Sequence, residues 1–159
     1  MTTARIPREP GVTLFARSDG ATVPNAPVLL LAHGLGIASE LWDGLVPHLP
    51  PAVRVVRWDG RGQGRSVQPP GPVRMGQLVS DAEAVCDFMG LREVVMLGLS
   101  LGGLVAQGLA VKRLDLVRGL ILSNTAARIG TPEFWRARAA LVRAQGMGPV
   151  VEPALPRWF

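Results

Sequence analysis

The sequence predicts an α/β fold of three layers, in which a mostly parallel β-sheet lies between layers of helices. Three observations support this prediction. Apolar residues make up 48% of the 159 residues and charged residues only 18%, a balance typical of a chain that buries a sheet on both faces. Short apolar runs alternate with segments of helical periodicity, as parallel βαβ units require. Glycine-rich turns follow several of the apolar runs.

The first half of the chain holds four predicted strands. They are residues 3–6, 12–17, 28–32 and 53–58. The first two are short and are joined by a Pro-Arg-Glu-Pro-Gly turn, whereas the last two are apolar runs typical of buried strands. Between the third and the fourth strand, Ser39 is predicted to cap a short helix that runs to Leu49 and ends before Pro50.

The second half of the chain alternates helices with strands. The predicted helices are residues 73–89, 101–112 and 131–145, and the predicted strands are residues 93–97 and 117–122. The first of these helices ends at Gly90 and has one apolar face, formed by Leu78, Val79, Ala82, Val85, Cys86 and Met89. The last helix begins with Thr131 as its N-cap and Pro132 in its first turn, and it stops at Gly146.

Composition and charge narrow the class of protein. The net charge is +5, but the basic residues, all Arg except Lys112, are scattered, and Tyr is absent. Nucleic-acid-binding proteins concentrate basic residues on one face, so we expect no nucleic-acid partner; an attraction for anionic substrates is the milder interpretation. Glycine and polar residues interrupt the longest apolar stretch, 94–111, which argues against a membrane span. The single cysteine and a start without an apolar signal segment predict a cytoplasmic protein.

The strongest functional signal is the segment Gly98-Leu99-Ser100-Leu101-Gly102-Gly103, which stands between a predicted strand and a predicted helix. This G-x-S-x-G pattern in that context predicts a nucleophile elbow, with Ser100 as the nucleophile. In such a strained turn, side chains two residues away on either side would collide with their neighbours, and glycine removes that collision. The turn aims the hydroxyl outward over the N-terminus of the following helix, where N–H groups favour developing negative charge.

A second loop, His33-Gly34-Leu35-Gly36, follows the strand 28–32. In this architecture it faces the elbow, so the backbone N–H groups of Leu35 and Leu101 are predicted to form an oxyanion hole. We interpret His33 as a hydrogen-bonding brace for the loop in preference to a general base, because such sites draw their base from farther along the chain. His48 is expected to be exposed and to have no catalytic role.

The remaining motifs have plain structural interpretations. In Gly60-Arg61-Gly62-Gln63-Gly64 the third glycine comes too early for a dinucleotide fingerprint, and the segment is predicted to be a turn. No glycine loop is followed by the Gly-Lys-Ser/Thr of a phosphate cradle. Cys86 lies on an apolar helix face and is predicted to fill the core. We therefore expect neither a cofactor nor a metal.

Together these residues resemble the α/β-hydrolase superfamily. The resemblance is carried by residues 33–36, Trp42-Asp43, residues 57–66 and residues 98–103. The segment 122–130, Leu-Ser-Asn-Thr-Ala-Ala-Arg-Ile-Gly, followed by Phe134-Trp135, is similar to the 3-oxoadipate enol-lactonases of aromatic-acid breakdown. The resemblance implies an α/β-hydrolase core over residues 1–130, incomplete after its sixth strand. It implies the beginning of a helical cap over residues 131–159, where Trp158-Phe159 also fits.

The resemblance also implies a substrate and roles for particular residues. The substrate would be an enol-lactone that bears a carboxylate and is opened by water to 3-oxoadipate. Ser100 would attack or activate the lactone carbonyl, while Leu35 and Leu101 hold the oxyanion. In the cap, Trp135 would supply an apolar wall of the pocket, and Arg138, one helical turn further on the same face, would meet the carboxylate.

The sequence departs from the family in one respect. The family takes its acid and its histidine from segments after the sixth strand, but no histidine follows Ser100, and Asp115 lies at the wrong end of its helix. We therefore expect a fragment that is inactive alone, needs a C-terminal segment, and leaves the strand 117–122 as an apolar edge. Two alternatives stay open: another carboxylic-ester or C–C bond hydrolase of this fold, and a non-catalytic hydrolase-like domain that binds a ligand or partner.

Overall fold

The computed structural model describes residues 1–154 and 156, and the chain forms two compact units. The first unit comprises Met1–Ala127, and the second begins at Arg128. The expected boundary lay at residues 130 and 131, within the loop that follows the last strand. Trp158-Phe159, which we expected to belong to a cap, lies outside the described residues.

A six-stranded sheet forms the centre of the first unit, with the order β1-β2-β4-β3-β5-β6. Its strands are β1 (Thr2–Pro7), β2 (Thr13–Gly20), β3 (Val28–Ala32), β4 (Arg54–Trp58), β5 (Val94–Leu99) and β6 (Val117–Ser123). β1 and β2 pair antiparallel, and β2 pairs antiparallel with β4. The strands β4, β3, β5 and β6 all run parallel, so the predicted α/β fold with a mostly parallel sheet is confirmed.

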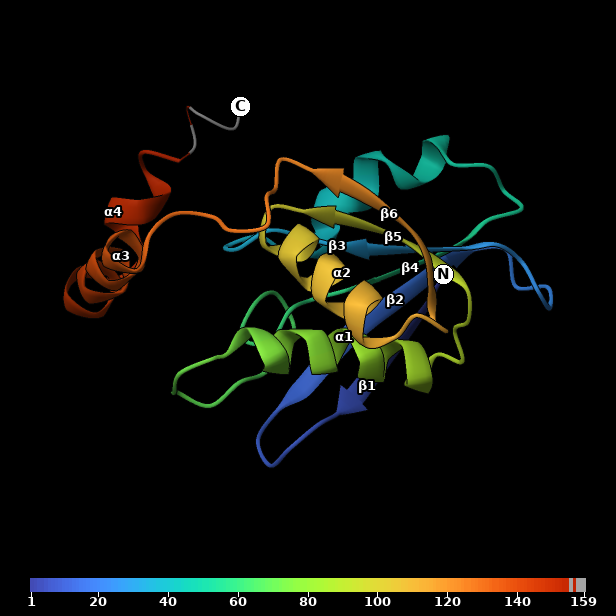
Figure 1. Ribbon diagram of the computed structural model, residues 1–159, viewed down its shortest axis with the longest axis horizontal. Helices are drawn as coiled ribbons and strands as arrows, with labels where there is room; N and C mark the ends of the chain where they lie inside the picture. The colour runs from blue at the N-terminus through green and yellow to red at the C-terminus, as the bar shows by residue number, and fades with distance from the viewer. Residues whose placement is uncertain (155, 157–159) are drawn as a thin grey trace. The chain divides into compact units, whose positions relative to one another are not determined.

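Helices cover both faces of this sheet, which gives the three predicted layers (Figure 1). α1 (Met75–Phe88) and α2 (Leu101–Lys112) pack on one face, over the larger core. The predicted apolar face of α1 is confirmed, since Val79, Ala82 and Val85 are buried in that core. On the other face, Trp42 packs with Leu31 and other strand residues in a smaller cluster.

The prediction of one short helix that is capped by Ser39 and runs to Leu49 is wrong in detail. The segment forms two 3₁₀ helices, η1 (Ser39–Gly44) and η2 (Val46–His48), and Ala38 is the N-cap. Ser39 is instead the first residue of η1, where its hydroxyl accepts a hydrogen bond from Arg17 and its N–H donates to Asp59. These partners lie far away in the sequence, so the tertiary fold overrides the local capping pattern.

β6 is an edge strand within the described sheet, as the sequence predicts. Its consecutive residues Leu120, Ile121 and Leu122 are 36%, 47% and 46% exposed. A parallel strand with apolar residues on both faces is normally buried between neighbours, so β6 has the sequence of a central strand in an edge position.

The second unit consists of α3 (Pro132–Gln145) and α4 (Gly148–Val151) in its described part. The N-cap prediction for α3 is confirmed, because the Thr131 side chain accepts the Phe134 N–H at 3.2 Å. Gly146 follows the end of α3, where it was expected. α4 was not predicted from the sequence. Among the described residues of the whole chain, no helix has the length and apolar character that crossing a membrane requires.

Candidate active site

Ser100 lies in a sharp turn between the end of β5 and the start of α2. Its backbone angles are φ 52° and ψ −113°, which a non-glycine residue adopts only when the surrounding fold enforces them. Its N–H donates to the carbonyl oxygen of Ser123, at the end of the neighbouring strand β6, at 3.0 Å. The predicted strand–elbow–helix geometry is therefore confirmed, and the strain is of the kind found at functional sites.

The two flanking glycines are required by contacts with backbone. A Cβ on Gly98 would lie 2.5 Å from the Gly102 carbonyl oxygen. A Cβ on Gly102 would lie 2.2 Å from the Ala32 carbonyl oxygen and 2.8 Å from that of His33. These distances are shorter than van der Waals contact, so the collision predicted from the sequence is present on both sides of Ser100, and α2 can approach β3 only with glycine at 102.

The loop after β3 faces the elbow, as expected. A Cβ on Gly34 would lie 3.4 Å from the Ser100 Cβ, which places this loop in van der Waals contact with the turn. The next residue, Leu35, is 44% exposed, and Leu101 is the first residue of α2. The structure thus brings the loop that carries the Leu35 N–H close to the turn that carries the Leu101 N–H. This juxtaposition is the one that a two-donor oxyanion hole requires.

His33 is buried, and both of its ring nitrogens are engaged. Nε2 accepts the Gly60 N–H at 2.9 Å, so the proton is on Nδ1, which donates to the Gly34 carbonyl oxygen at 2.7 Å. Burial lowers the pKa of His33, and this effect exceeds the opposing pull of the Gly34 carbonyl and of Asp59. His33 is therefore a neutral brace for the loop, as predicted from the sequence, and within the described residues neither it nor His48 bonds to the Ser100 hydroxyl.

The loop 59–66 holds the His33 loop from outside. Asp59 is buried, and its carboxylate accepts the N–H of Ser39 at 2.7 Å and the N–H of Arg65 at 2.8 Å. Gln63 reaches back to the His33 loop, where its Oε1 accepts the Gly36 N–H at 2.6 Å. The segment is a turn, as predicted, but its role as a brace was missed, because neither pattern nor spacing indicates which loop a turn contacts.

An ion pair anchors this brace to α1. Both guanidinium nitrogens of Arg61 that face Asp81 bond to its carboxylate at 2.6 Å, and both side chains are 2% exposed. Arg8 adds a bond to Asp81 at 3.0 Å, and Glu9 bonds to Arg61 at 2.6 Å. The bonds from Arg61 to Asp81 are the largest cause of a raised pKa of Arg61, and the bond to Glu9 is a smaller cause, so the guanidinium stays charged.

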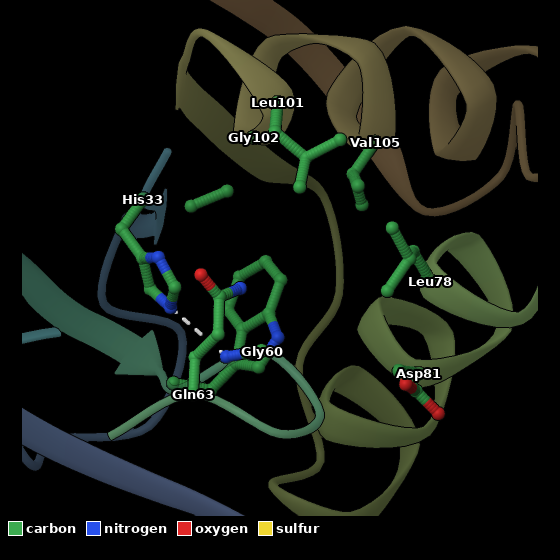
Figure 2. A pocket seen from close by; sticks show the side chains of 10 residues that line it. His33, Gly60, Gln63, Leu78, Asp81, Leu101, Gly102 and Val105 are labelled. Carbon is green, nitrogen blue, oxygen red and sulfur yellow. Dashed lines mark hydrogen bonds between the residues drawn. The ribbon is translucent and has the colours of Figure 1, made fainter. Parts of the chain in front are cut away.

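A small cavity lies between the loop 59–66 and the helices α1 and α2 (Figure 2). Its volume of about 30 Å³ has room for about one or two water molecules. His33, Gly60 and Gln63 line one side, and Leu101 and Gly102 of the first turn of α2 line another (Figure 2). Ser100 is not among the residues that line this cavity.

Hydrogen bonds join the end of β6 and the segment after it to the elbow and to α2. Besides the bond from Ser100 to Ser123, the Thr125 hydroxyl donates to the Ser100 carbonyl oxygen at 2.7 Å. Gln107 of α2 donates to the carbonyl oxygen of Ala126 at 3.2 Å. In the sequence, the Asn-Thr-Ala-Ala segment indicated only a family resemblance. The signal that could have found the contact is strand adjacency, because β6 and β5 pair so that Ser123 lies beside Leu99.

The other residues singled out from the sequence lie away from the elbow. Cys86 is fully buried in the main core, and burial raises its pKa to about 12, so it is an unreactive core thiol. His48 is exposed at the end of η2, as expected. Asp115 bonds to Arg113 at 2.8 Å, and this bond lowers its pKa to about 2. Asp115 precedes the first residue of β6, whereas Ser100 bonds to Ser123 at the last residue of that strand. Asp115 therefore lies at the opposite end of β6 from the elbow.

Trp135 and Arg138 lie on one face of α3, as predicted. The Trp135 indole N–H donates to the Ile129 carbonyl oxygen at 2.6 Å, and Phe134 packs against the Trp135 ring edge-to-face with centroids 5.1 Å apart. The Arg138 guanidinium lies 5.9 Å from the centroid of the Trp135 ring. A cation over an indole face is a stabilising arrangement, so these two side chains form one apolar and cationic surface.

A strained serine elbow after a parallel strand, faced by a glycine loop, is the arrangement of the α/β-fold hydrolases. The chain belongs to the alpha/beta hydrolase family, whose model matches residues 27–146. It is similar to 3-oxoadipate enol-lactonase 2 of Acinetobacter baylyi, with 37% identity over 84% of this chain and 50% of the relative.

Solved structures agree with this assignment. The enol-lactonase of Burkholderia xenovorans LB400 superimposes with a TM-score of 0.87 and 39% identity, over 93% of this chain and 57% of the other. A malate-bound thermophilic esterase of Thermogutta terrifontis superimposes with a TM-score of 0.85 and 33% identity, over 99% of this chain and 59% of the other. The chain spans about half the length of the curated relatives it matches.

Proposed function

We propose that this chain supplies the nucleophile half of a serine hydrolase that opens a carboxylate-bearing enol-lactone, with 3-oxoadipate enol-lactone as the substrate. The observation that carries the proposal is the conformation of Ser100, at φ 52° and ψ −113° on an elbow that faces the Leu35 loop. A strained backbone conformation costs free energy, so a serine with a purely structural role would be expected in an ordinary conformation. The strain at the half-buried Ser100 therefore supports a functional role. The similarity to two enol-lactonases supports the substrate class.

The reaction follows from the placement of these groups. The Ser100 Oγ gives its proton to a base and attacks the lactone carbonyl carbon, whose π electrons move to oxygen. The N–H groups of Leu35 and Leu101 hold that oxyanion. When the intermediate collapses, the ring C–O bond breaks, the enol oxygen takes the proton from the base, and the enol tautomerises to the ketone. The base then deprotonates water, which attacks the acyl carbonyl; the C–O bond to Ser100 breaks, and the base returns the proton to the Ser100 oxygen.

The base and its acid partner come, in this proposal, from polypeptide outside residues 1–159. His33 cannot act as the base, because both ring nitrogens are engaged with Gly60 and Gly34. His48 is exposed, and no histidine follows Ser100 in the sequence. The relatives are about twice as long as the matched region, which leaves room for such a segment. The exposed edge of β6 is the place where we propose that it pairs.

For the substrate carboxylate we propose the surface formed by Trp135 and Arg138. The indole supplies an apolar wall, and its face holds the guanidinium in place for a carboxylate. The helix that carries both residues would act as the beginning of a cap. The buried thiol of Cys86, in a chain with a single cysteine, supports a cytoplasmic location as part of the proposal.

The test is Ser100→Ala in the whole protein that contains this chain, assayed for lactone hydrolysis. We expect a loss of kcat of at least about 10⁴-fold with unchanged thermal stability, because only the attacking oxygen is removed. Ser80→Ala, on α1, is the matched control and should retain activity. Turnover of Ser100→Ala at a rate near wild type would show that the serine is structural.

A second candidate is a carboxylic-ester hydrolase, favoured by the similarity to the Thermogutta terrifontis esterase. The chemistry at Ser100 would be the same, and only the pocket would differ. Comparing kcat/KM for an enol-lactone with that for an uncharged ester decides between them. A non-catalytic binding domain, the remaining alternative, predicts that Ser100→Ala leaves ligand binding intact and that neither substrate is turned over.

A further inference from the structure

Two peptide units supply the N–H groups of the proposed oxyanion hole. One joins Gly34 to Leu35, and the other joins Ser100 to Leu101. In each unit the carbonyl oxygen lies at the opposite end of the same planar group from the N–H that would hold the oxyanion. Because a trans peptide is rigid, a bond that fixes the direction of the carbonyl also fixes the direction of the N–H.

A side-chain donor bonds to the carbonyl oxygen in both units, and the Ser100 oxygen also accepts the backbone N–H groups of Gly103 at 3.0 Å and Leu104 at 3.3 Å. Nδ1–H of His33 donates to the Gly34 oxygen at 2.7 Å, and the hydroxyl of Thr125 donates to the Ser100 oxygen at 2.7 Å. The first bond is local, whereas the second crosses from the segment after β6 to the elbow. A hydrogen bond to an amide oxygen also polarises the amide, so its N–H becomes a stronger donor.

The position of Thr125 is fixed by its surroundings. A Cβ on Gly103 would lie 2.5 Å from both Oγ1 and Cγ2 of Thr125, so the side chain fills the space that this second glycine leaves open. Gln107 donates both to the Gly103 oxygen at 3.0 Å and to the Ala126 oxygen, which joins the first turns of α2 to the Thr125 segment. The Thr125 side chain therefore packs against Gly103 in the first turn of α2.

We propose that Thr125 is a positioning residue of the oxyanion hole, which orients and polarises the Ser100–Leu101 peptide as His33 does the Gly34–Leu35 peptide. The inference rests on the proposed function, in which the Leu101 N–H stabilises an oxyanion. Thr125 itself does not contact substrate. Its effect is confined to the step in which negative charge develops, so it acts on kcat and on affinity for tetrahedral adducts.

The test uses Thr125→Val, which keeps the shape and removes the donor, and Thr125→Ser, which keeps the donor. In the whole protein we expect Thr125→Val to lower kcat by about ten- to a hundredfold, with little change in KM. Affinity for a boronic acid, which forms a tetrahedral adduct on serine, should fall by the same factor. Thr125→Ser should restore most of both. Thr13→Val, at a half-buried threonine of β2, is the matched control and should change neither.

The amide proton shift of Leu101, measured by NMR in the same variants, keeps the inference separate from the proposed function. We expect it to move upfield in Thr125→Val and to return in Thr125→Ser, whether or not the protein turns over a lactone. If Ser100→Ala retains activity but this shift moves, the proposed function fails and the role in an oxyanion hole fails with it, and only the polarisation of the Ser100–Leu101 peptide by Thr125 stands. If Ser100→Ala is inactive while Thr125→Val changes neither kcat nor the Leu101 shift, the positioning role is overturned and the function stands.

Discussion

Gly60 donates its backbone N–H to Nε2 of His33 at 2.9 Å, and this contact decides which nitrogen of the imidazole carries the proton. With Nε2 occupied as an acceptor, Nδ1–H is left to hold the carbonyl oxygen of Gly34. A protonated ring would place an N–H against the N–H of Gly60. The hydrogen bonds by which His33 holds the Gly34–Leu35 peptide therefore require a neutral imidazole.

Mild acid should destabilise the protein through His33. Burial lowers its pKa in the folded protein, whereas the unfolded chain has the ordinary value of about 6.5. As the pH falls below about 6.5 the unfolded chain takes up the proton first, so the free energy of unfolding decreases until the folded pKa is passed. Urea unfolding at pH 7.5, 6 and 5 measures this. His33→Gln should lose that part of the pH dependence and His48→Gln should keep it; equal slopes in all three proteins would contradict the prediction.

Gly102→Ala should be among the most damaging single substitutions in the chain. The new Cβ would lie 2.2 Å from the carbonyl oxygen of Ala32, and backbone on both sides cannot move without separating α2 from β3. We expect a loss of about 2–4 kcal/mol in the free energy of unfolding. Gly76→Ala in α1, where a Cβ meets nothing within 4 Å, should instead be neutral or stabilising by up to about 1 kcal/mol. Similar effects of the two substitutions on the unfolding midpoint would refute the steric argument.

Much of this architecture could be predicted from local sequence. β3 and α2 have the predicted bounds, because a continuous apolar run and a glycine-bounded helix are signals contained within their own residues. The elbow could be predicted for the same reason, since the glycines that Ser100 needs are two residues away. Asn124 and Thr125 were informative in the sequence only as a resemblance.

What could not be predicted depends on contacts between distant residues. Ser39 lies inside η1 and bonds to Arg17 and Asp59, and no local pattern indicates those partners. The bonds from Gln63 to Gly36 and from Thr125 to Ser100 join loops that only the strand order brings together. Spacing identified the groups that would do the chemistry, whereas the groups that hold them in place became visible only in the folded chain.

The ion pair between Arg61 and Asp81 should matter more than the surface pairs. Asp81→Asn leaves the buried guanidinium without a counter-charge beyond Glu9, and we expect a loss of about 3–5 kcal/mol in the free energy of unfolding. Glu133→Gln, which removes an exposed pair with Arg136, should have no measurable effect. Thermal unfolding of both variants tests this. An Asp81→Asn midpoint close to that of Glu133→Gln would show that the Arg61 anchor is dispensable.

The edge of β6 should make the 159-residue chain self-associate or remain loosely packed. Leu120, Ile121 and Leu122 are exposed beside unpaired backbone groups, and such edges recruit other strands. Sedimentation velocity should show species larger than the monomer, and Ile121→Lys should reduce them. Co-expression with the corresponding C-terminal half of an enol-lactonase relative should also reduce them. A chain that sediments as a monomer and melts cooperatively would contradict the proposal that another segment pairs with β6.

The central claim is that Ser100 is the nucleophile, and covalent trapping tests it most directly. The whole protein that contains this chain should be treated with a fluorophosphonate, digested, and mapped by mass spectrometry. We predict a single adduct on Ser100, in proportion to the loss of lactone hydrolysis, and its absence in Ser100→Ala. Labelling of a different serine, or full inhibition with Ser100 unmodified, would contradict the account.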